Sequence, residues 1–152
     1  MPPGKYDPDC TEGITRVQDL PSPVAEQRSR NYRRRACTHC GRGCYRDNLG
    51  RRVLHDLGRL SGDRPRDLHV VYSRHRCLHC RLYFSADLSG LAPPGSHYTH
   101  RVIARAVRLV VEDGLPYRAA SWHLWRDHRV FVPFATLQNW VEAAGGKSGR
   151  AS

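Results

Sequence analysis

Two short cysteine motifs restrict what this chain can fold into more than any other feature of its sequence. Cys37-Thr38-His39-Cys40 and Cys77-Leu78-His79-Cys80 share the spacing CxxC. Two such turns, when brought together, supply four thiolates at the corners of a tetrahedron, which is the ligand set of structural zinc. Thirty-six residues separate Cys40 from Cys77, more than the usual spacer of about 15–20. The sequence therefore predicts a folded excursion between the motifs and one structural Zn²⁺ held by Cys37, Cys40, Cys77 and Cys80.

The remaining cysteines and the histidines inside the motifs leave alternatives to this ligand set. Cys44 lies four residues after the first motif and could replace one of its two cysteines, although the paired motifs are complete without it. Cys10 lies in a stretch rich in Pro and Gly, and we expect a free thiol there. His39 and His79 could also be ligands. Because residues inside such turns usually point away from the metal, we expect these histidines at the surface or facing phosphate.

Other uses of the cysteines fit the sequence less well. Disulfides are uncommon in proteins without an export signal, and no apolar segment follows Lys5 at the N-terminus. A redox CxxC usually occurs alone, near a βαβ pattern. A catalytic zinc needs an open coordination position and a general base, whereas four thiolates close the site. A ribbon-type nuclease would also need a His–Asn pairing, and Asn occurs only at positions 31, 48 and 139. These features favour a structural over a catalytic metal, with a ribbon-type nuclease as the weaker alternative.

The segment between the motifs has the pattern of a β-hairpin. The first strand is expected in the short, half-apolar segment 51–57, and the turn in residues 58–65, which are rich in turn formers. The second strand is expected in residues 68–76, which alternate between apolar and polar positions. Residues 81–84 could add a third short strand. Knuckle, hairpin and knuckle together predict a zinc ribbon over residues 37–90, in which metal binding supplies much of the folding energy.

The positive charge is concentrated in the same window. The chain carries 25 Lys and Arg against 14 Asp and Glu, a formal net charge of +11. Residues 28–82 contain fifteen arginines and four acids, so this window accounts for the whole excess. A guanidinium makes two parallel hydrogen bonds to phosphate, and a basic patch of this kind indicates a nucleic-acid partner. The arginines that we expect to contact DNA phosphates are Arg33, Arg34, Arg35, Arg51, Arg52, Arg74 and Arg76.

Residues 97–146 have the pattern of three helices. Apolar residues repeat at helical spacing from Val102 to Val110, Gly114 stops the first helix, and Pro116 opens the second. A second short helix is expected from Tyr117 to Trp125, followed by a loop. The third helix is expected to begin at Pro133 and to end near residues 145–146. The sequence therefore predicts a helix-turn-helix after the ribbon, within a small α+β fold.

The third of these helices has two different faces. Its expected buried face consists of Leu137, Trp140, Val141 and Ala144, and its opposite face of Ala135, Gln138, Asn139 and Glu142. Gln and Asn can make two hydrogen bonds to an adenine edge, and a Thr methyl group can contact the thymine methyl group. The residues predicted to contact DNA bases are Thr136, Gln138 and Asn139. The alternative is a plain helical hairpin whose polar face has no partner.

The order of these parts resembles the N-terminal region of bacterial insertion-sequence transposases of the ISL-three type and related groups. The matching stretches are the two CxxC motifs, residues 81–84 after the second motif, Gly114-Leu-Pro-Tyr-Arg-Ala-Ala-Ser121 and Thr136-Leu-Gln-Asn-Trp140-Val141. The resemblance covers roughly residues 37–144. It implies a bacterial, cytoplasmic and nucleoid-associated DNA-binding protein. Its partner would be double-stranded DNA, and the resemblance implies that the binding sites are the terminal inverted repeats of a mobile element.

Two features depart from this family. The segment 125–132 between the second and third helices is longer than the turn of a standard helix-turn-helix. The catalytic domain of the family, which holds two metal ions with three carboxylates, has no counterpart among the acids after residue 90. We therefore expect a DNA-binding portion of a transposase that does not catalyse strand transfer itself.

Several further expectations complete this interpretation. Residues 1–36 are expected to be an irregular N-terminal tail, and residues 147–152 a linker-like tail. No apolar run approaches the roughly 20 residues of a membrane helix, so no membrane partner is expected. A homodimer is compatible with the sequence. A stand-alone zinc-dependent DNA-binding regulator is an alternative function. An RNA-binding zinc ribbon is another, and it would need exposed aromatic residues for stacking.

Overall fold

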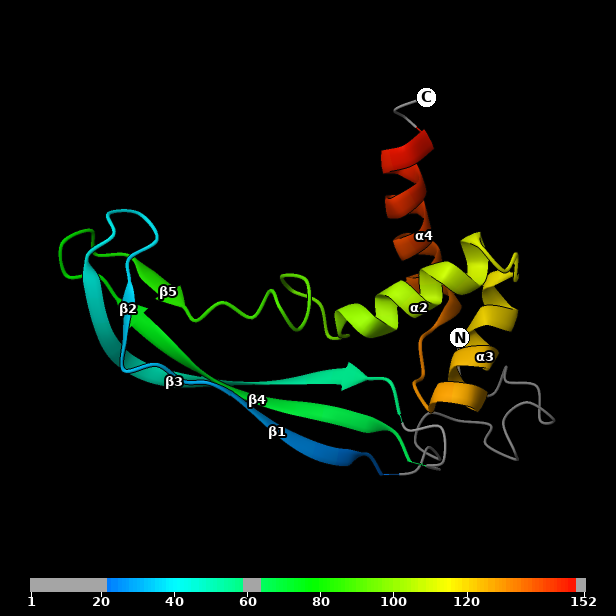
Figure 1. Cartoon of the computed structure of the whole chain (residues 1–152), viewed down its shortest axis with the longest axis horizontal. Helices are drawn as coiled ribbons and strands as arrows, with labels where there is room; N and C mark the ends of the chain where they lie inside the picture. Colours follow the sequence, from blue (N-terminus) through cyan, green and yellow to red (C-terminus); the bar gives the residue numbers. More distant parts are fainter. Residues whose placement is uncertain (1–21, 59–63, 150–152) are drawn as a thin grey trace.

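The computed structural model describes residues 22–58 and 64–149. These form a small α+β structure in which the strands and the helices are separate (Figure 1). Strands β1–β5 build an elongated arm (residues 24–85), and the helices pack together at one end of it as a helical unit (residues 100–149). In chain order the elements are β1 (Val24–Arg30), β2 (Arg34–Ala36), β3 (Gly43–Asp56), β4 (Arg66–Arg76), β5 (Tyr83–Ser85), α2 (His100–Val111), α3 (Tyr117–His128) and α4 (Phe134–Gly149).

The arm is a mixed sheet built on one long hairpin. Strands β3 and β4 pair antiparallel from Asp56↔Arg66 to Arg46↔His75, with a register shift between Arg46 and Asn48. Strand β1 pairs parallel with the first part of β4, and β5 pairs antiparallel with its last part. Strand β2 pairs antiparallel with the start of β3. Short strands therefore reinforce the hairpin along its length, and the two CxxC turns lie at its end far from the helices (Figure 1).

The strand boundaries correct several sequence predictions. The hairpin is longer than predicted, because β3 begins at Gly43 rather than at residue 51. Part of the predicted irregular tail forms β1 and β2, since the edges of β4 and β3 offer unpaired backbone groups with which these segments can bond; residues 1–21 lie outside the described part of the chain. The third short strand after the second motif is confirmed as β5.

The helix boundaries also differ from the predicted ones. Helix α3 runs to His128 instead of ending at Trp125, and Arg129 caps it in the left-handed conformation. The connection to α4 is therefore the segment 129–133, shorter than the predicted one. Helix α4 continues to Gly149, so the first part of the predicted linker-like tail is helical, and residues 150–152 lie outside the described chain. No helix in the described ranges is long and apolar enough to cross a membrane.

Opposite faces of β4 are buried at the two ends of the arm. Near the helices, Leu68 and Val70 pack with Leu54 and Ala92 under the segment that follows β5. Toward the tip, the intervening positions Ser73 and His75 are fully buried instead. Because successive residues of a strand point to opposite faces, the covered face changes part-way along β4. The predicted alternation of residues 68–76 thus describes the arm only at its base.

The helical unit has a core of its own. Val102, Ala106 and Leu109 of α2 meet Leu124 of α3 and Leu137 of α4, and all five side chains are at most 1% exposed. The spacing of the α2 residues follows the helical period, as the sequence predicted. The core is completed by Ala120, Val130 and Val132.

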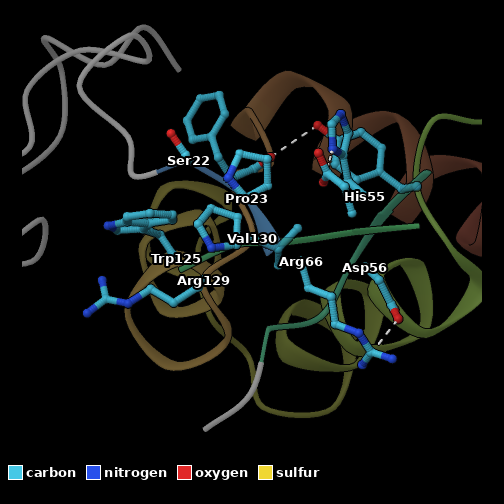
Figure 2. Close-up of a pocket in the computed structure, with 12 residues that line it drawn as sticks. Ser22, Pro23, His55, Asp56, Arg66, Trp125, Arg129 and Val130 are labelled. Atoms are coloured by element: carbon cyan, nitrogen blue, oxygen red, sulfur yellow. Dashed lines mark hydrogen bonds and ion pairs between the residues drawn. The ribbon is translucent and has the colours of Figure 1, made fainter. Parts of the chain in front are cut away.

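The arm and the helical unit meet at the buried carboxylate of Asp56. Thr99 at the start of α2 donates a 2.7 Å hydrogen bond to Asp56, and the guanidinium groups of Arg66 and Arg101 lie 3.6 and 3.5 Å from its other oxygen. A cleft of about 390 Å³ lies at this junction. Figure 2 shows Asp56 beside Arg66 in the cleft, with Trp125 and Arg129 across from them. The paired charges make this junction a structural joint between the two parts.

Candidate metal centre and nucleic-acid interface

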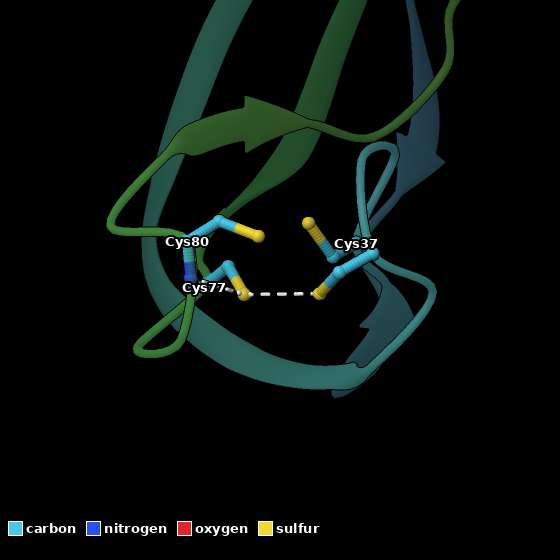
Figure 3. Close-up of side chains that lie close together, drawn as sticks. Cys37, Cys77 and Cys80 are labelled. Atoms are coloured by element: carbon cyan, nitrogen blue, oxygen red, sulfur yellow. Dashed lines mark hydrogen bonds between the residues drawn. The ribbon is translucent and has the colours of Figure 1, made fainter.

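The four predicted cysteine ligands come together at the tip of the arm (Figure 3). The sulfur atoms of Cys37, Cys40, Cys77 and Cys80 all lie within 4.8 Å of one another. Cys40 Sγ and Cys77 Sγ are 3.6 Å apart, close to the roughly 3.8 Å edge of a tetrahedron with metal–sulfur bonds of about 2.3 Å. The described cysteines form no disulfide. This group of thiols could hold one metal ion with four sulfur ligands.

The first knuckle (residues 37–42) and the second knuckle (residues 77–82) have the same backbone design. In the first, Cys37 N–H donates to Arg42 O at 2.7 Å and Gly41 N–H donates to Cys37 O at 2.9 Å. In the second, the equivalent bonds run from Cys77 to Leu82 O and from Arg81 to Cys77 O. Both turns use a left-handed residue after the second cysteine, with φ +78° at Gly41 and +59° at Arg81. The repeated bonds fix the direction in which each thiol points.

Backbone amides and neighbouring thiols separate the pKa values within the cluster. The N–H of Cys80 donates to Cys77 Sγ at 3.3 Å, and this bond is the main cause that lowers the pKa of the Cys77 thiol to about 6. Cys37 also has a lowered pKa, because the backbone N–H groups of Cys40 and His39 face its sulfur. Hydrogen bonding to Cys40, together with burial, raises the pKa of the Cys80 thiol to about 12. The high pKa of Cys80 means that this thiol keeps its proton at neutral pH without a cation, so binding a metal would displace that proton.

The alternatives to these ligands have different positions. Cys44 is buried, but its sulfur donates to Arg42 O at 3.3 Å and does not belong to the four-sulfur group. Burial is the main cause that raises the pKa of Cys44. His39 and His79 are exposed and also lie outside the group. Cys10 lies outside the described residues.

A buried polar network behind the knuckles has no clear signal in the sequence. The ring of His75 is completely buried and stacks on Phe84, with ring centres 5.3 Å apart. Its two nitrogens lie 3.0 Å from Cys44 O and 2.8 Å from Ser73 Oγ, and Ser73 Oγ accepts a hydrogen bond from Tyr32 N–H at 3.1 Å. The network joins β3, β4 and the segment between β1 and β2, and it thereby holds the tip in place.

The arginines predicted to contact phosphate all lie on the arm and remain accessible. Arg33, Arg34, Arg51, Arg74 and Arg76 are exposed, whereas Arg35 and Arg52 are half-buried. Arg52 donates to the backbone oxygen of Ser96. In residues 22–58 and 64–149, no ion pair involves any of the seven. They form an unneutralised cationic surface along the arm.

Sequence reasoning missed the tyrosines that accompany these arginines. Four guanidinium groups lie near tyrosine rings, at 4.5–5.6 Å from the ring centres; the pairs are Arg35–Tyr32, Arg34–Tyr45, Arg74–Tyr72 and Arg76–Tyr83. Such distances allow cation–π attraction. Tyr45 and Tyr83 are 63% and 67% exposed, so these rings do not belong to the buried cluster of cysteines and Phe84 at the tip. The register of the strands places Arg34 opposite Tyr45 and Arg76 opposite Tyr83, and no spacing along the chain reveals these two pairs. The other two pairs are local, because Arg74 follows Tyr72 by two residues and Arg35 follows Tyr32 by three.

Helix α4 presents most of its predicted polar face to solvent. Gln138 and Asn139 are exposed, and Thr136 is half-buried. Gln138 Nε2 donates to Glu142 Oε1 at 2.9 Å. On the predicted inner face Leu137 is buried and Trp140 and Val141 are half-buried, but Ala144 is exposed because α4 extends past the helices beside it (Figure 1).

No protein-family model, curated protein or solved structure matches this chain.

Proposed function

We propose that this chain is a DNA-binding protein, the DNA-binding part of a transposase that recognises the ends of a mobile element. The observation that carries the proposal is the cationic surface of the arm. The seven arginines predicted to contact phosphate have no ion-pair partner among the described residues, and unpaired guanidinium groups on a protein of net charge +11 favour a polyanion. The transposase role rests on the resemblance of the sequence motifs.

The metal of this proposal is Zn²⁺, and its role is structural. Four thiolates are the donor set that zinc prefers, and they leave no open position for catalysis. The cysteines join two segments that lie far apart in the sequence, so the bound ion would hold the tip of a zinc ribbon with an extended hairpin. The bound ion would then fix the positions of arginines next to the knuckles, such as Arg34 and Arg76.

The helical unit would supply sequence recognition as a helix-turn-helix. The exposed amides of Gln138 and Asn139 can each make two hydrogen bonds to an adenine edge. Gln138 would exchange its bond to Glu142 for a bond to a base, which costs little because that bond is exposed to water. Phosphate contacts by the arm would fix the register in which α4 meets the bases.

The salt dependence of duplex binding tests the proposal. Affinity for a blunt duplex should fall steeply as salt rises, and Arg74→Gln or Arg76→Gln should each lower the slope of log K against log salt by about 1. Arg28→Gln is the matched control, because Arg28 lies on the same arm but Glu26 already holds its guanidinium at 3.0 Å. Its slope should stay at the wild-type value. A flat salt response, or equal effects of all three substitutions, would overturn the proposal.

A further inference from the structure

A groove of about 400 Å³ lies at the tip of the arm, between the start of β3 and the second knuckle. Its lining includes Arg42, Tyr45, Arg46, Asp47, Arg76 and Leu78. The groove thus combines three cations, an aromatic ring and an apolar side chain.

Tyr45 is the aromatic wall of this groove, and packing does not account for its position. The ring is 63% exposed, and it lies outside the small cluster of cysteines and Phe84 that forms the core of the tip. Arg34, its partner in the register of β2 and β3, places its guanidinium 5.6 Å from the ring centre. An exposed ring supported in this way is a platform on which a nucleic-acid base can stack, and Arg adds cation–π attraction.

The cations of the groove are available for phosphate. Arg42, Arg46 and Arg76 make no ion pair within the described ranges, and Asn31 Oδ1 holds the Arg46 guanidinium at 2.7 Å. Asp47 opposes phosphate, but a carboxylate can accept a hydrogen bond from the amino group of a base.

The surrounding charge favours an anion even with a metal in the cluster. Residues 30–47 and 74–81 contain nine arginines and one acid. A divalent ion held by four thiolates keeps a net charge of about −2, which is much smaller than this excess. The tip therefore stays strongly positive in the metal-bound protein.

We propose that this groove binds an unpaired nucleotide of DNA, with the base stacked on Tyr45 and the phosphate held by Arg42, Arg46 and Arg76. In a duplex each base already stacks on its neighbours and shows only its edges to a protein, so a stacking platform serves bases that have left the helix. The inference rests on the proposed DNA binding and extends it. Duplex binding uses the arginines along the arm and α4, with Arg76 shared between the two surfaces, whereas the groove adds selectivity for DNA that has a single-stranded or opened end.

The test compares three labelled duplexes of the same sequence by fluorescence anisotropy. One is blunt, one carries a three-nucleotide overhang, and one carries an overhang of three abasic sugar phosphates. The wild-type protein should bind the overhang with bases about five- to a hundredfold more tightly than the abasic overhang, the range that stacking of one base provides. Tyr45→Phe, the matched control, should keep this preference because it keeps the ring.

Tyr45→Ala should lose the preference while it binds the blunt duplex within about twofold of wild type, and its metal content serves as the check on folding. Tyr45→Leu replaces it if the alanine variant loses metal. Equal affinities of wild type for the two overhangs, or an unchanged preference without the ring, would overturn the inference. A failure of duplex binding alone would instead overturn the proposed function. In that case a single strand of thymidines and its abasic counterpart repeat the comparison without a duplex.

Discussion

Replacing Gly41 with alanine should weaken metal binding by about 5- to 30-fold. Gly41 follows the second cysteine of the first knuckle with φ +78°, in the left-handed region that costs other L-residues roughly 1–2 kcal/mol. A Cβ built on Gly41 meets no heavy atom within 4 Å, so the substitution changes the backbone preference without a steric clash. A penalty of about 1–2 kcal/mol corresponds to the stated loss of affinity at 1.4 kcal/mol per tenfold.

Metal affinity is the appropriate measurement because the knuckle conformation and metal binding are coupled. Metal binding contributes the folding energy of such small sites, so strain in the bound turn appears directly as weaker binding. The assay is a competition between the protein and a coloured zinc chelator under reducing conditions. Gly90→Ala is the matched control, since a Cβ at Gly90 also meets nothing within 4 Å and its φ is not in the left-handed region. It should change the affinity by less than about twofold.

At the second knuckle, the same reasoning predicts that a substitution to glycine does not weaken metal binding. Arg81 already occupies the equivalent position with φ +59°, so Arg81→Gly should relieve strain. The greater freedom of glycine in the unfolded chain offsets part of this gain, and the affinity should stay equal or rise by a few fold. Gly41→Asn should recover part of the loss, since asparagine tolerates this conformation. Equal affinities of Gly41→Ala and Gly90→Ala, or a loss in Arg81→Gly as large as in Gly41→Ala, would refute the reasoning.

Two further predictions concern the cluster and the joint. Cys44→Ser should retain one metal per chain in elemental analysis, because Cys44 Sγ faces Arg42 O and lies outside the four-sulfur group; a loss as complete as in Cys77→Ser would make it a ligand. Asp56→Ala should lower the unfolding free energy by about 2–4 kcal/mol, since it removes the buried hydrogen-bond acceptor of Thr99 and the ion-pair partner of two arginines. Thermal unfolding followed by circular dichroism measures this change. The control Asp113→Ala, at an exposed position, should leave the melting temperature unchanged. Equal melting temperatures of the Asp56→Ala and Asp113→Ala variants would contradict the structural role of Asp56.

Local sequence rules predicted the parts of this protein whose structure depends on neighbouring residues. The CxxC spacing predicted which thiols meet, because each turn orients its own pair and the second pair completes the tetrahedron. The apolar period from Val102 to Val110 and the stop at Gly114 predicted α2 for the same reason. The exposed faces of Gln138 and Asn139 followed from the helical period alone.

The parts that sequence reasoning missed depend on contacts between distant segments. Strand β1 lies in a stretch without apolar alternation, and its parallel pairing with β4 comes from backbone bonds that any residue can make. His75 is buried against Phe84 and the Cys44 carbonyl, and Ser73 is bonded to Tyr32 N–H. These contacts join separate segments, and no hydrophobic periodicity along the chain predicts them.

The sequence by itself determined the cysteine cluster, the helices and the excess of arginine, because each depends on residue type and short spacing. Only the tertiary structure decided where the charge and the aromatic rings lie relative to the cluster. The register of β2, β3 and β4 places Tyr45 beside Arg34 and opens a groove next to Cys77. Register is set by the pairing of whole strands, so a feature that depends on it becomes visible only when the strands have been assembled.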